Sequence, residues 1–381
     1  MNIKTDVSIV RMEEYTPEEA KRALTEALAP FGGLDWVKEG MKIAVKVNLL
    51  TARKPEDATT THPVLVCALC EMLCERGAKV VVGDSPGGLF NAAFLLPIYK
   101  ITGMASVEKA GATLNDNYRE RDFHFPGAVK MKDFRITEYL LEADAVINFC
   151  KLKTHGLMAF TGACKNLFGA IPGLKKSECH YLFPKTEDFA DMLVDICEAI
   201  KPVINIADGV VAMEGNGPTV GTPRKLGALL AAENAHALDL AAGGLMGLTT
   251  KEAPTLSAAL RRGLIPESVK ELNIQGDYNS FVADDFKIPP IRPIKSWGSG
   301  NPFFSDLLES LLANKPHVLR DKCVGCGICL KRCPAGAITM RKNRPVIDRK
   351  KCIRCFCCQE FCEREGMVVR RSFLGWVVYH R

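Results

Sequence analysis

The sequence predicts a layered α/β domain with a mostly parallel sheet and flanking helices, followed by a small C-terminal α+β domain. Residues 1–284 alternate short apolar runs with runs of helical periodicity, as α/β proteins do. Nine of the 16 cysteines follow residue 320, so the C-terminal part has a framework of its own. We expect domains at 1–284 and 316–381, joined over 285–315 by a linker and a short helix.

The first elements have clear boundary signals. Val7 to Arg11 has the pattern of a short strand. Thr16-Pro17-Glu18-Glu19 combines an N-cap, a proline in the first turn and a capping-box glutamate, so a helix should begin there and run to about Ala29. Ile43 to Val47 predicts the next strand, with Lys46 towards its carboxyl end.

An apolar helix should follow the Thr61-His62-Pro63 segment. Cys67, Cys70 and Cys74 lie on one face of it at spacings of three and four, among valines and leucines. Because buried free cysteine behaves as a small apolar residue, we interpret these thiols as core and not as metal ligands.

The remaining elements of the α/β domain follow from short apolar runs. Lys79 to Val82 predicts a strand that leads into Gly83-Asp84-Ser85, either a tight turn or a phosphate loop, and the spacing is not that of a nucleotide fingerprint. Further elements are expected as strands at Ala145 to Phe149, Val203 to Ala207 and Leu226 to Ala232, a helix from Asp239, a stiff linker over 289–302 and a helix from Phe304 to Ala313.

The C-terminal segment contains two runs of cysteines with the spacing C-x2-C-x2-C-x3-C, which is typical of bacterial ferredoxins with two 4Fe-4S clusters. In such proteins the fourth cysteine of each run ligates the other cluster. A structural zinc site would show separated C-x2-C pairs instead. We predict a ferredoxin-like domain with one cluster on Cys323, Cys326, Cys329 and Cys362, and a second on Cys333, Cys352, Cys355 and Cys358.

The two cysteine runs form an internal duplication with an offset of 29 residues, which predicts a small pseudo-twofold module. The halves differ where Arg354 and Phe356 replace Gly325 and Gly327. Because glycines let backbone N–H groups approach sulfur, the two clusters should differ in hydrogen bonding and potential. Cys357 is a spare thiol beside the ligands, and we expect it to pack and not to ligate.

Basic residues gather after the strand expected at Ala145 to Phe149, with no Asp or Glu between Asp144 and Glu178. Ligands of open α/β sheets bind outside the carboxyl ends of the strands. We therefore predict an anion site in which Lys153, His155 and Lys165 act on the ligand. Lys151 and Asn166 would help to bind it. The alternative is a solvated basic loop.

Three acids, Asp208, Glu214 and Asp239, fall near strand ends. They could ligate a hard cation, act as acid or base, or cap helices. Capping is the simplest role for Asp239, at the start of an expected helix, whereas Asp208 and Glu214 are candidate binding residues.

These motifs resemble the prokaryotic family called domain of unknown function 362, often fused to a ferredoxin module. The resemblance spans roughly residues 40–250 and the fusion order, and it implies a cytoplasmic ferredoxin-type iron–sulfur protein, common in anaerobes. The matching segments are Thr61-His62-Pro63, Gly83-Asp84-Ser85, Lys151 to His155, Thr161 to Gly169, Asp208-Gly209 and Met213 to Pro218.

Composition and charge limit the function classes. The longest apolar window is broken by charged residues, so no membrane span is expected. The cysteine pattern favours a reducing cytoplasm over a secreted scaffold. Residues 321–381 contain 14 Lys and Arg against five Asp and Glu. We attribute this excess to compensation of the cluster charge and to docking of a redox partner protein. Nucleic acid is disfavoured because the basic residues are not interleaved with stacking aromatics.

The sequence thus predicts an electron-transfer protein in which two 4Fe-4S clusters pass electrons to or from an anionic ligand or a partner at the α/β domain, acting as an oxidoreductase. One alternative is an electron carrier whose α/β domain only docks partners. Another is a regulator whose clusters sense oxygen or iron.

Overall fold

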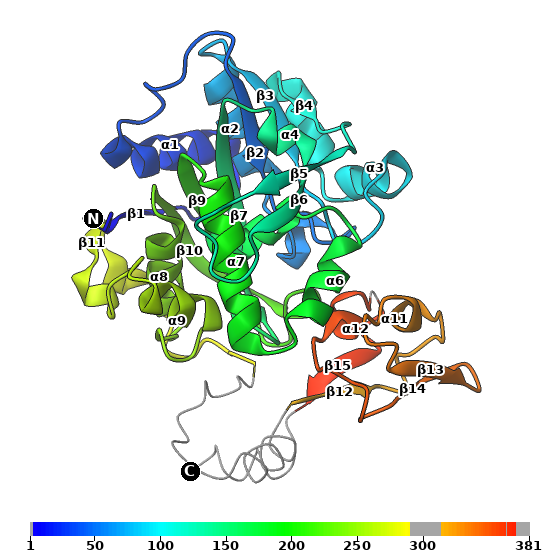
Figure 1. Cartoon of the computed structure of the whole chain (residues 1–381). Coiled ribbons are helices and arrows are strands. Elements are labelled where there is room, and N and C mark those ends of the chain that lie inside the picture. Colours follow the sequence, from blue (N-terminus) through cyan, green and yellow to red (C-terminus); the bar gives the residue numbers. More distant parts are fainter. Residues whose placement is uncertain (1–2, 290–313, 363, 371–381) are drawn as a thin grey trace.

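The computed structural model describes residues 3–289, 314–362 and 364–370. It contains an α/β domain and a smaller C-terminal module packed against one side of it (Figure 1). The helix expected at Phe304 to Ala313 and most of the expected linker lie outside the described residues.

One sheet forms the centre of the α/β domain. Its strands run in the order β11-β1-β10-β9-β7-β2-β3-β4, with β8 paired to β7. The segment β9-β7-β2-β3-β4 is parallel and β10 is antiparallel to both of its neighbours, so the prediction of a mostly parallel sheet is confirmed. The strands are β1 (Asp6–Arg11), β2 (Lys42–Lys46), β3 (Lys79–Gly83), β4 (Thr113–Leu114), β7 (Ala145–His155), β8 (Ala159–Thr161), β9 (Ile204–Glu214), β10 (Thr222–Ala232) and β11 (Asn273–Gln275).

Helices cover both faces of this sheet and bury two cores. On β2, Ile43 and Val45 belong to one core and Ala44 belongs to the other, as the alternation of strand side chains requires. The helices are α1 (Pro17–Leu28), α2 (Pro63–Cys74), α3 (Ala92–Ile101), α4 (Glu138–Leu141), α5 (Ala163–Asn166), α6 (Lys175–Leu182), α7 (Thr186–Ile200), α8 (Ala235–Leu245) and α9 (Pro254–Arg261). A hairpin of β5 (Glu120–His124) and β6 (Asp133–Thr137) lies beside the sheet.

Short 3-10 turns complete the α/β domain: η1 (Ala29–Phe31), η2 (Pro55–Asp57), η3 (Met104–Ala110), η4 (Leu167–Ala170), η5 (Val269–Glu271) and η6 (Tyr278–Phe281). The predicted N-cap of α1 is present, since the Thr16 hydroxyl accepts the backbone N–H of Glu19.

The two strands that carry most of the predicted site are longer than expected. β7 continues from Phe149 through His155, so Lys151 and Lys153 lie on a strand buried along its whole length and not in a solvated loop. β9 likewise continues past Asp208 to Glu214. Each long strand has a long partner, because β10 pairs with β9 as far as Glu214 and β8 pairs with the last residues of β7.

The expected helix start at Asp239 is wrong. α8 begins at Ala235 and is capped by the Asn234 side chain, which accepts the N–H groups of His236 and Ala237. Asp239 instead caps a different helix. Its carboxylate accepts the backbone N–H groups of Ala163 and Cys164 in the first turn of α5.

The C-terminal module has the internal symmetry that the duplication predicts. It consists of β12 (Lys315–Val318), α11 (Ile328–Lys331), β13 (Ile338–Arg341), β14 (Arg344–Ile347), α12 (Cys357–Glu360) and β15 (Met367–Arg370). β12 pairs with β15 and β13 with β14, both antiparallel.

The symmetry extends to the backbone angles of the module. Gly325 and Gly327 have φ of 74° and 75°, and their counterparts Arg354 and Phe356 have φ of 57° and 62°. The second half therefore keeps a left-handed backbone conformation that favours glycine. This conformation costs about 1–2 kcal/mol for each non-glycine residue. Burial of Phe356, which is 2% exposed, helps to offset this cost.

The α2 cysteines pack as predicted. Cys70 is fully buried in a core cluster, Cys67 and Cys74 are partly buried, and burial raises the pKa of all three thiols. Buried free cysteine among valines and leucines behaves as a small apolar residue, which fits the assignment of Cys70 to the core.

We predict that Cys70→Ala lowers the free energy of unfolding by about 1–2 kcal/mol, because it leaves a small cavity in the core. Denaturant unfolding of the variant and wild type measures the change. The iron content should be the same in both proteins, and loss of iron from the variant would overturn the assignment of this thiol to the core.

Candidate functional site

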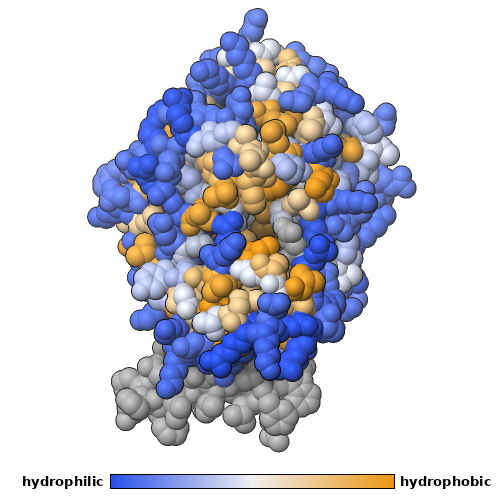
Figure 2. All heavy atoms as spheres, turned by 90° about the vertical axis from the view of Figure 1, so that its right-hand side faces the viewer, coloured by the Kyte–Doolittle hydropathy of each residue, from blue (hydrophilic) through white to orange (hydrophobic). Residues whose placement is uncertain are grey.

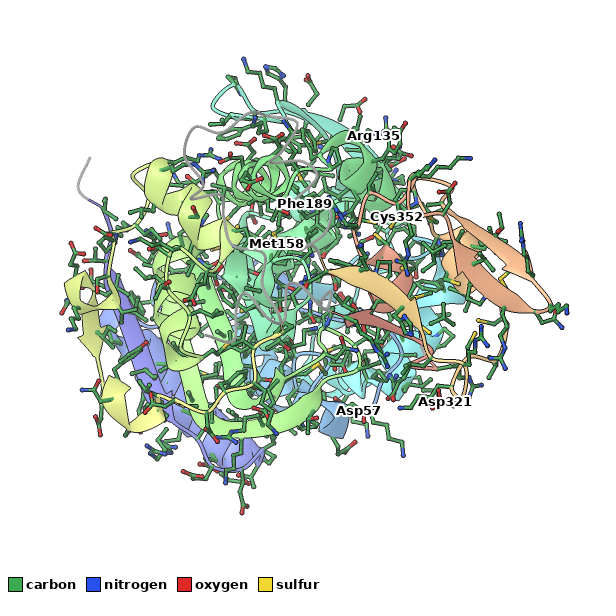
Figure 3. The ribbon with its side chains drawn as sticks, turned by 90° about the horizontal axis from the view of Figure 1, so that it is seen from below. Asp57, Arg135, Met158, Phe189, Asp321 and Cys352 are labelled. Atoms are coloured by element: carbon green, nitrogen blue, oxygen red, sulfur yellow. The ribbon has the colours of Figure 1, made fainter. Side chains whose placement is uncertain are left out.

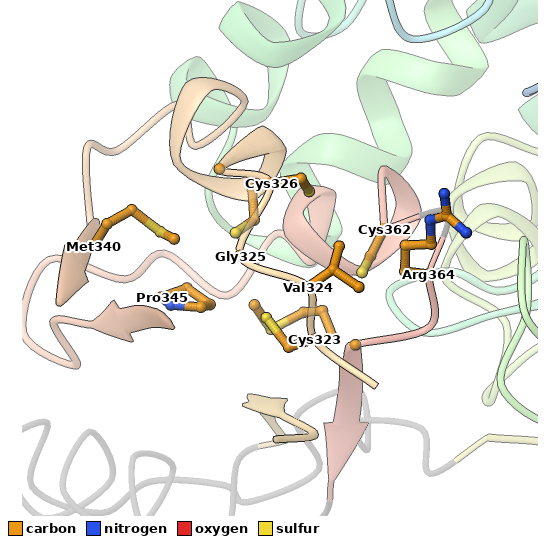
Figure 4. A pocket seen from close by; sticks show the side chains of 12 residues that line it. Cys323, Val324, Gly325, Cys326, Met340, Pro345, Cys362 and Arg364 are labelled. Atoms are coloured by element: carbon orange, nitrogen blue, oxygen red, sulfur yellow. The ribbon is translucent and has the colours of Figure 1, made fainter. Parts of the chain in front are cut away.

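Four predicted cluster ligands surround one cavity of the C-terminal module. The cavity is lined by Cys323, Cys326, Cys329 and Cys362, together with Gly325, Gly327, Met340 and Pro345. Figure 4 shows Cys323, Cys326 and Cys362 gathered around it. Cys362 comes from the second cysteine run, so the cavity has the ligand set that crossed ligation requires. Burial raises the pKa of Cys329, and the neighbouring thiols raise it further.

The other four predicted ligands also gather. Burial raises the pKa of Cys352, and Cys355 and Cys333 are close enough for their charges to raise it further. The same is true of Cys358, which is 9% exposed and lies near both of those thiols. These four thiols lie close together and are partly or fully buried, so they could hold a second cluster as the first four could hold the first. Cys357 is buried beside them at the start of α12.

Beside this module, five lysines meet at the carboxyl ends of the parallel strands, and we call them the basic cluster. Lys46, Lys151 and Lys153 are at most 1% exposed, Lys176 is 9% exposed and Lys165 is partly buried. They come from the end of β2, the end of β7, α5 and α6. Lys46 and Lys176 were not predicted as members, because Lys46 lies on a strand about 100 positions away and Lys176 follows the last motif of the basic segment, which ends at Gly169.

Lys151 and Asp208 form a buried ion pair. Lys151 Nζ lies 2.8 Å from Asp208 Oδ2 and 3.0 Å from the Tyr15 hydroxyl, and the backbone N–H of His62 donates to the same carboxylate. Burial lowers the pKa of Lys151 despite its partner. Both side chains are 0% exposed, so the structure places Lys151 and Asp208 in a framework role and not facing a ligand.

A second ion pair joins Lys46 to Asp84, the acid of the turn after β3. Lys46 Nζ lies 2.7 Å from Asp84 Oδ1, and the backbone N–H of Leu49 donates to the other carboxylate oxygen. Gly169 lies directly against this pair, since a Cβ there would fall 2.1 Å from Asp84 Oδ1. The Gly83-Asp84-Ser85 segment therefore anchors a lysine.

Asn166 connects these strands through its side chain. Its oxygen accepts from Asn48 Nδ2 at 3.1 Å, and its nitrogen donates to Asn148 Oδ1 at 2.8 Å and to the Lys46 carbonyl at 3.3 Å. With both ends engaged, Asn166 positions the strand ends and is not directed at a ligand.

Lys153 and Lys176 both have a pKa well below that of a free lysine. Lys153 Nζ donates to Asn48 Oδ1 at 2.6 Å and to the Thr59 carbonyl at 2.5 Å. Burial, with the charges of Lys151 and Lys165, lowers the pKa of Lys153 to about 7. Burial also lowers the pKa of Lys176 to about 7, with Lys46 adding to the effect and Asp84 opposing it.

The C-terminal module supplies a carboxylate to the basic cluster. Glu360 Oε1, at the end of α12, lies 2.9 Å from His155 Nε2. Burial alone would raise the pKa of Glu360, but the contact with His155 and the charge of Lys165 outweigh burial and hold it at about 2. Sequence analysis missed this residue because it lies inside the cysteine motif, about 200 positions from the lysines.

The hydrogen bonds of His155 define its tautomer. Nδ1 accepts the backbone N–H groups of Leu157 and Met158, and burial lowers the pKa of the ring, so Nε2 carries the proton that faces Glu360. The two facing atoms are not aligned as a hydrogen bond, and neither has another partner within the described residues. The contact between them therefore joins the C-terminal module to β7.

Further contacts join α12 to the β9–β10 loop. Gln359 Nε2 donates to the carbonyls of Asn216 and Gly217, and the Thr219 hydroxyl donates to the Glu360 carbonyl. Figure 3 shows the module against one side of the α/β domain.

Glu214 is not part of the basic cluster. At the end of β9 its carboxylate accepts the Lys287 backbone N–H at 3.1 Å and lies 3.6 Å from Lys287 Nζ. Among the described residues, no contact supports the candidate binding role of Glu214. The three residues predicted to act on the ligand, Lys153, His155 and Lys165, do lie together. Lys165 and Lys153 both influence the pKa of His155.

The electrostatics of the site leave positive charge uncompensated. Five lysines face three carboxylates, Asp84, Asp208 and Glu360. A buried cation without a partner is costly, so the lysines either lose protons or take up an anion. Lys165 is the member best placed for an incoming anion, because it is the least buried residue of the five. Its Nζ lies 4.8 Å from the Phe168 ring centre.

Comparison with known proteins agrees with this architecture. The family described as domain of unknown function DUF362 matches residues 43–243, and a 4Fe-4S dicluster domain matches residues 315–363. The thylakoid-associated protein sll1697 of Synechocystis is 32% identical over 295 residues, which cover 75% of this chain and 88% of that protein.

A solved structure, that of the lactate racemase apoprotein from Thermoanaerobacterium thermosaccharolyticum, is similar with a TM-score of 0.40 and 13% identity. The similarity covers 65% of this chain and 58% of that one.

Within the described residues no helix has the length and apolar character needed to cross a membrane. The match to DUF362 covers more than half of the chain, and the dicluster module lies beside the strand-end lysines. This chain therefore belongs to the DUF362 family and is an iron–sulfur protein.

Proposed function

We propose that the protein transfers single electrons between two 4Fe-4S clusters in its C-terminal module and an anionic ligand at the basic cluster. The observation that carries this proposal is the contact of α12 with β7. The four residues of α12 include the predicted ligand Cys358 and also Glu360, which lies 2.9 Å from His155. A cluster held by Cys358 is therefore one helical turn from the residues that would hold the ligand.

The outer part of the module suits electron entry from a partner protein. Cys326 is the only exposed cysteine of the described chain, so the cluster that it would ligate lies near the surface. Figure 2 views the side that carries α3 and the module and shows apolar side chains gathered along it. Exposed apolar residues on these elements include Leu96 and Ile101 of α3 and Leu330 of α11. Such a surface fits transient docking of a redox partner.

The two clusters would act in series in this scheme. The partner passes an electron to the cluster of Cys323, Cys326, Cys329 and Cys362, and the second cluster passes it on towards the basic cluster. The ligand is the final acceptor, or the donor when the direction is reversed. Free buried thiols elsewhere in the chain suit a reducing compartment such as the cytoplasm.

A simple electron carrier is the second candidate function. It is favoured by the ion pairs of Lys46 and Lys151, which neutralise part of the basic cluster without a ligand. In that case the contact of Glu360 would only fix the module on the α/β domain. The two functions differ in whether an anion binds at Lys165.

The first test concerns the clusters. Anaerobically purified protein should contain about eight iron and eight acid-labile sulfide per chain, as two 4Fe-4S clusters require. Cys362→Ala should damage the cluster of Cys323, and Cys333→Ala should damage the cluster of Cys352, as resolved by electron paramagnetic resonance. If each variant instead lost the cluster of its own cysteine run, crossed ligation would be wrong.

The second test concerns the anion. Lys165→Ala should weaken binding of inorganic phosphate or acetate about ten- to a hundredfold, because a charge-assisted hydrogen bond contributes about 1.5–3 kcal/mol. Isothermal titration at constant ionic strength measures the affinity. Lys185→Ala removes an exposed lysine at the start of α7 and should bind as the wild type does. Equal affinities in all three proteins would favour the simple carrier.

The pH dependence of this binding has a definite sign. Because the pKa of Lys153 and of Lys176 is about 7, an anion meets both ammonium groups charged below pH 7 and neutral well above it. Affinity for acetate, whose own charge is constant from pH 6 to pH 9, should therefore fall as the pH rises through 7. A flat profile would show that these lysines do not contribute.

A further inference from the structure

Three side chains outside the basic cluster bring two thiols and an imidazole together in the core. They are Cys164 of α5, Cys197 of α7 and His236 of α8. Their ligand atoms all lie within 4.8 Å of one another, and the residues are at most 2% exposed. Three helices that are far apart in the sequence thus place soft donor atoms at one point.

The imidazole of His236 is oriented by a carboxylate. Its Nε2 lies 3.0 Å from Glu198 Oε1, the residue that follows Cys197 on α7. With Nε2 donating to this carboxylate, Nδ1 is left as the lone-pair donor. Metal-binding histidines almost always donate their other ring N–H to a carboxylate, a carbonyl or water in this way. The Glu198 side chain is 35% exposed, so this carboxylate reaches solvent.

We propose that this cluster binds one zinc ion through Cys164 Sγ, Cys197 Sγ and His236 Nδ1. Zinc–sulfur bonds of about 2.3 Å and zinc–nitrogen bonds of about 2.0–2.1 Å place the ligand atoms of a tetrahedral site about 3.5–4 Å apart. The spacing of the three donors accommodates this with small rotations of the side chains.

Charge balance also favours a divalent soft cation. When Zn²⁺ binds, both thiols release their protons to solvent, and two thiolates with a neutral imidazole give a site of zero net charge. Zero net charge is what a site with fully buried ligands requires, because an uncompensated charge there is costly. Thiolate and imidazole together select zinc over the hard cations magnesium and calcium.

The zinc ion would hold α5 in place beside the basic cluster. α5 has only four residues, too few to be stable without external contacts. Cys164 is followed in α5 by Lys165 and Asn166, so a bond at its sulfur fixes the turn that presents both side chains. The proposal does not depend on the electron-transfer function, because the clusters have other ligands.

Metal content and local structure provide the direct test. Full-length protein prepared anaerobically with both clusters should contain about one zinc per chain by plasma mass spectrometry. X-ray absorption at the zinc edge, which the iron does not contribute to, should show two sulfur neighbours at about 2.3 Å and at least one nitrogen neighbour at about 2.0–2.1 Å.

Glu198→Gln tests the site without removing a ligand or a buried group. Loss of this carboxylate should weaken zinc binding about 10- to 100-fold, measured by competition with a chelator, while iron content stays the same. The control Glu187→Gln changes a partly buried glutamate in the first turn of the same helix and should bind zinc as the wild type does. Cys197→Ser should lose zinc and retain iron.

Three results would overturn the proposal. One is protein that retains no zinc after equilibration with excess Zn²⁺ and removal of the free ion. Another is a zinc edge spectrum without sulfur neighbours. The third is mass spectrometry that finds a Cys164–Cys197 disulfide in the anaerobic protein, since that bond would use both sulfur ligands.

Discussion

Burial of excess positive charge at the strand ends is the constraint on which the rest of the structure depends. Lys46, Lys151 and Lys153 are almost fully buried, and the energetic cost of burying an ammonium group is high unless it is paired. Asp84 and Asp208 pair with the first two at 2.7 and 2.8 Å. Lys153 has only neutral oxygens as partners, and its pKa falls to about 7.

The C-terminal module provides the third carboxylate, Glu360, and this gives the contact between the two parts a chemical role. The carboxylate lies beside Lys165 and His155, which are the residues that the proposed anion would contact. Binding of an anion there must change the surroundings of Glu360, and Glu360 is two residues from the predicted ligand Cys358. Charge at the basic cluster and charge on a cluster held by Cys358 would therefore be close enough to influence each other.

The sequence predicted the fold class, the family and the iron–sulfur module, because each depends on local patterns. Strand and helix periodicity, the cysteine spacing and the offset of 29 residues are all visible in short windows. The candidate site was predicted only in part. Lys153, His155 and Lys165 do lie together, but the acids that compensate the lysines come from distant segments. The absence of acids near Lys151 in the sequence therefore did not imply an unpaired lysine.

The boundaries of the helices and strands could also be predicted only in part, because they depend on contacts with distant segments. β7 extends to His155 because β8 and β9 supply hydrogen-bond partners, which the amino-acid pattern of β7 alone does not reveal. Asp239 looked like the cap of its own helix, yet its carboxylate reaches α5 across the core. Cys164, Cys197 and His236 carried no spacing signal, since each comes from a different helix.

The central claim is that an anion at the basic cluster and the electrons of the nearer cluster are coupled through Glu360. The most direct measurement is the reduction potential of each cluster, followed by electron paramagnetic resonance, with and without saturating phosphate. Because binding linkage is reciprocal, phosphate should shift one potential in the wild type and should shift it less in Glu360→Gln. Phosphate that binds at Lys165 and leaves both potentials unchanged would contradict the account.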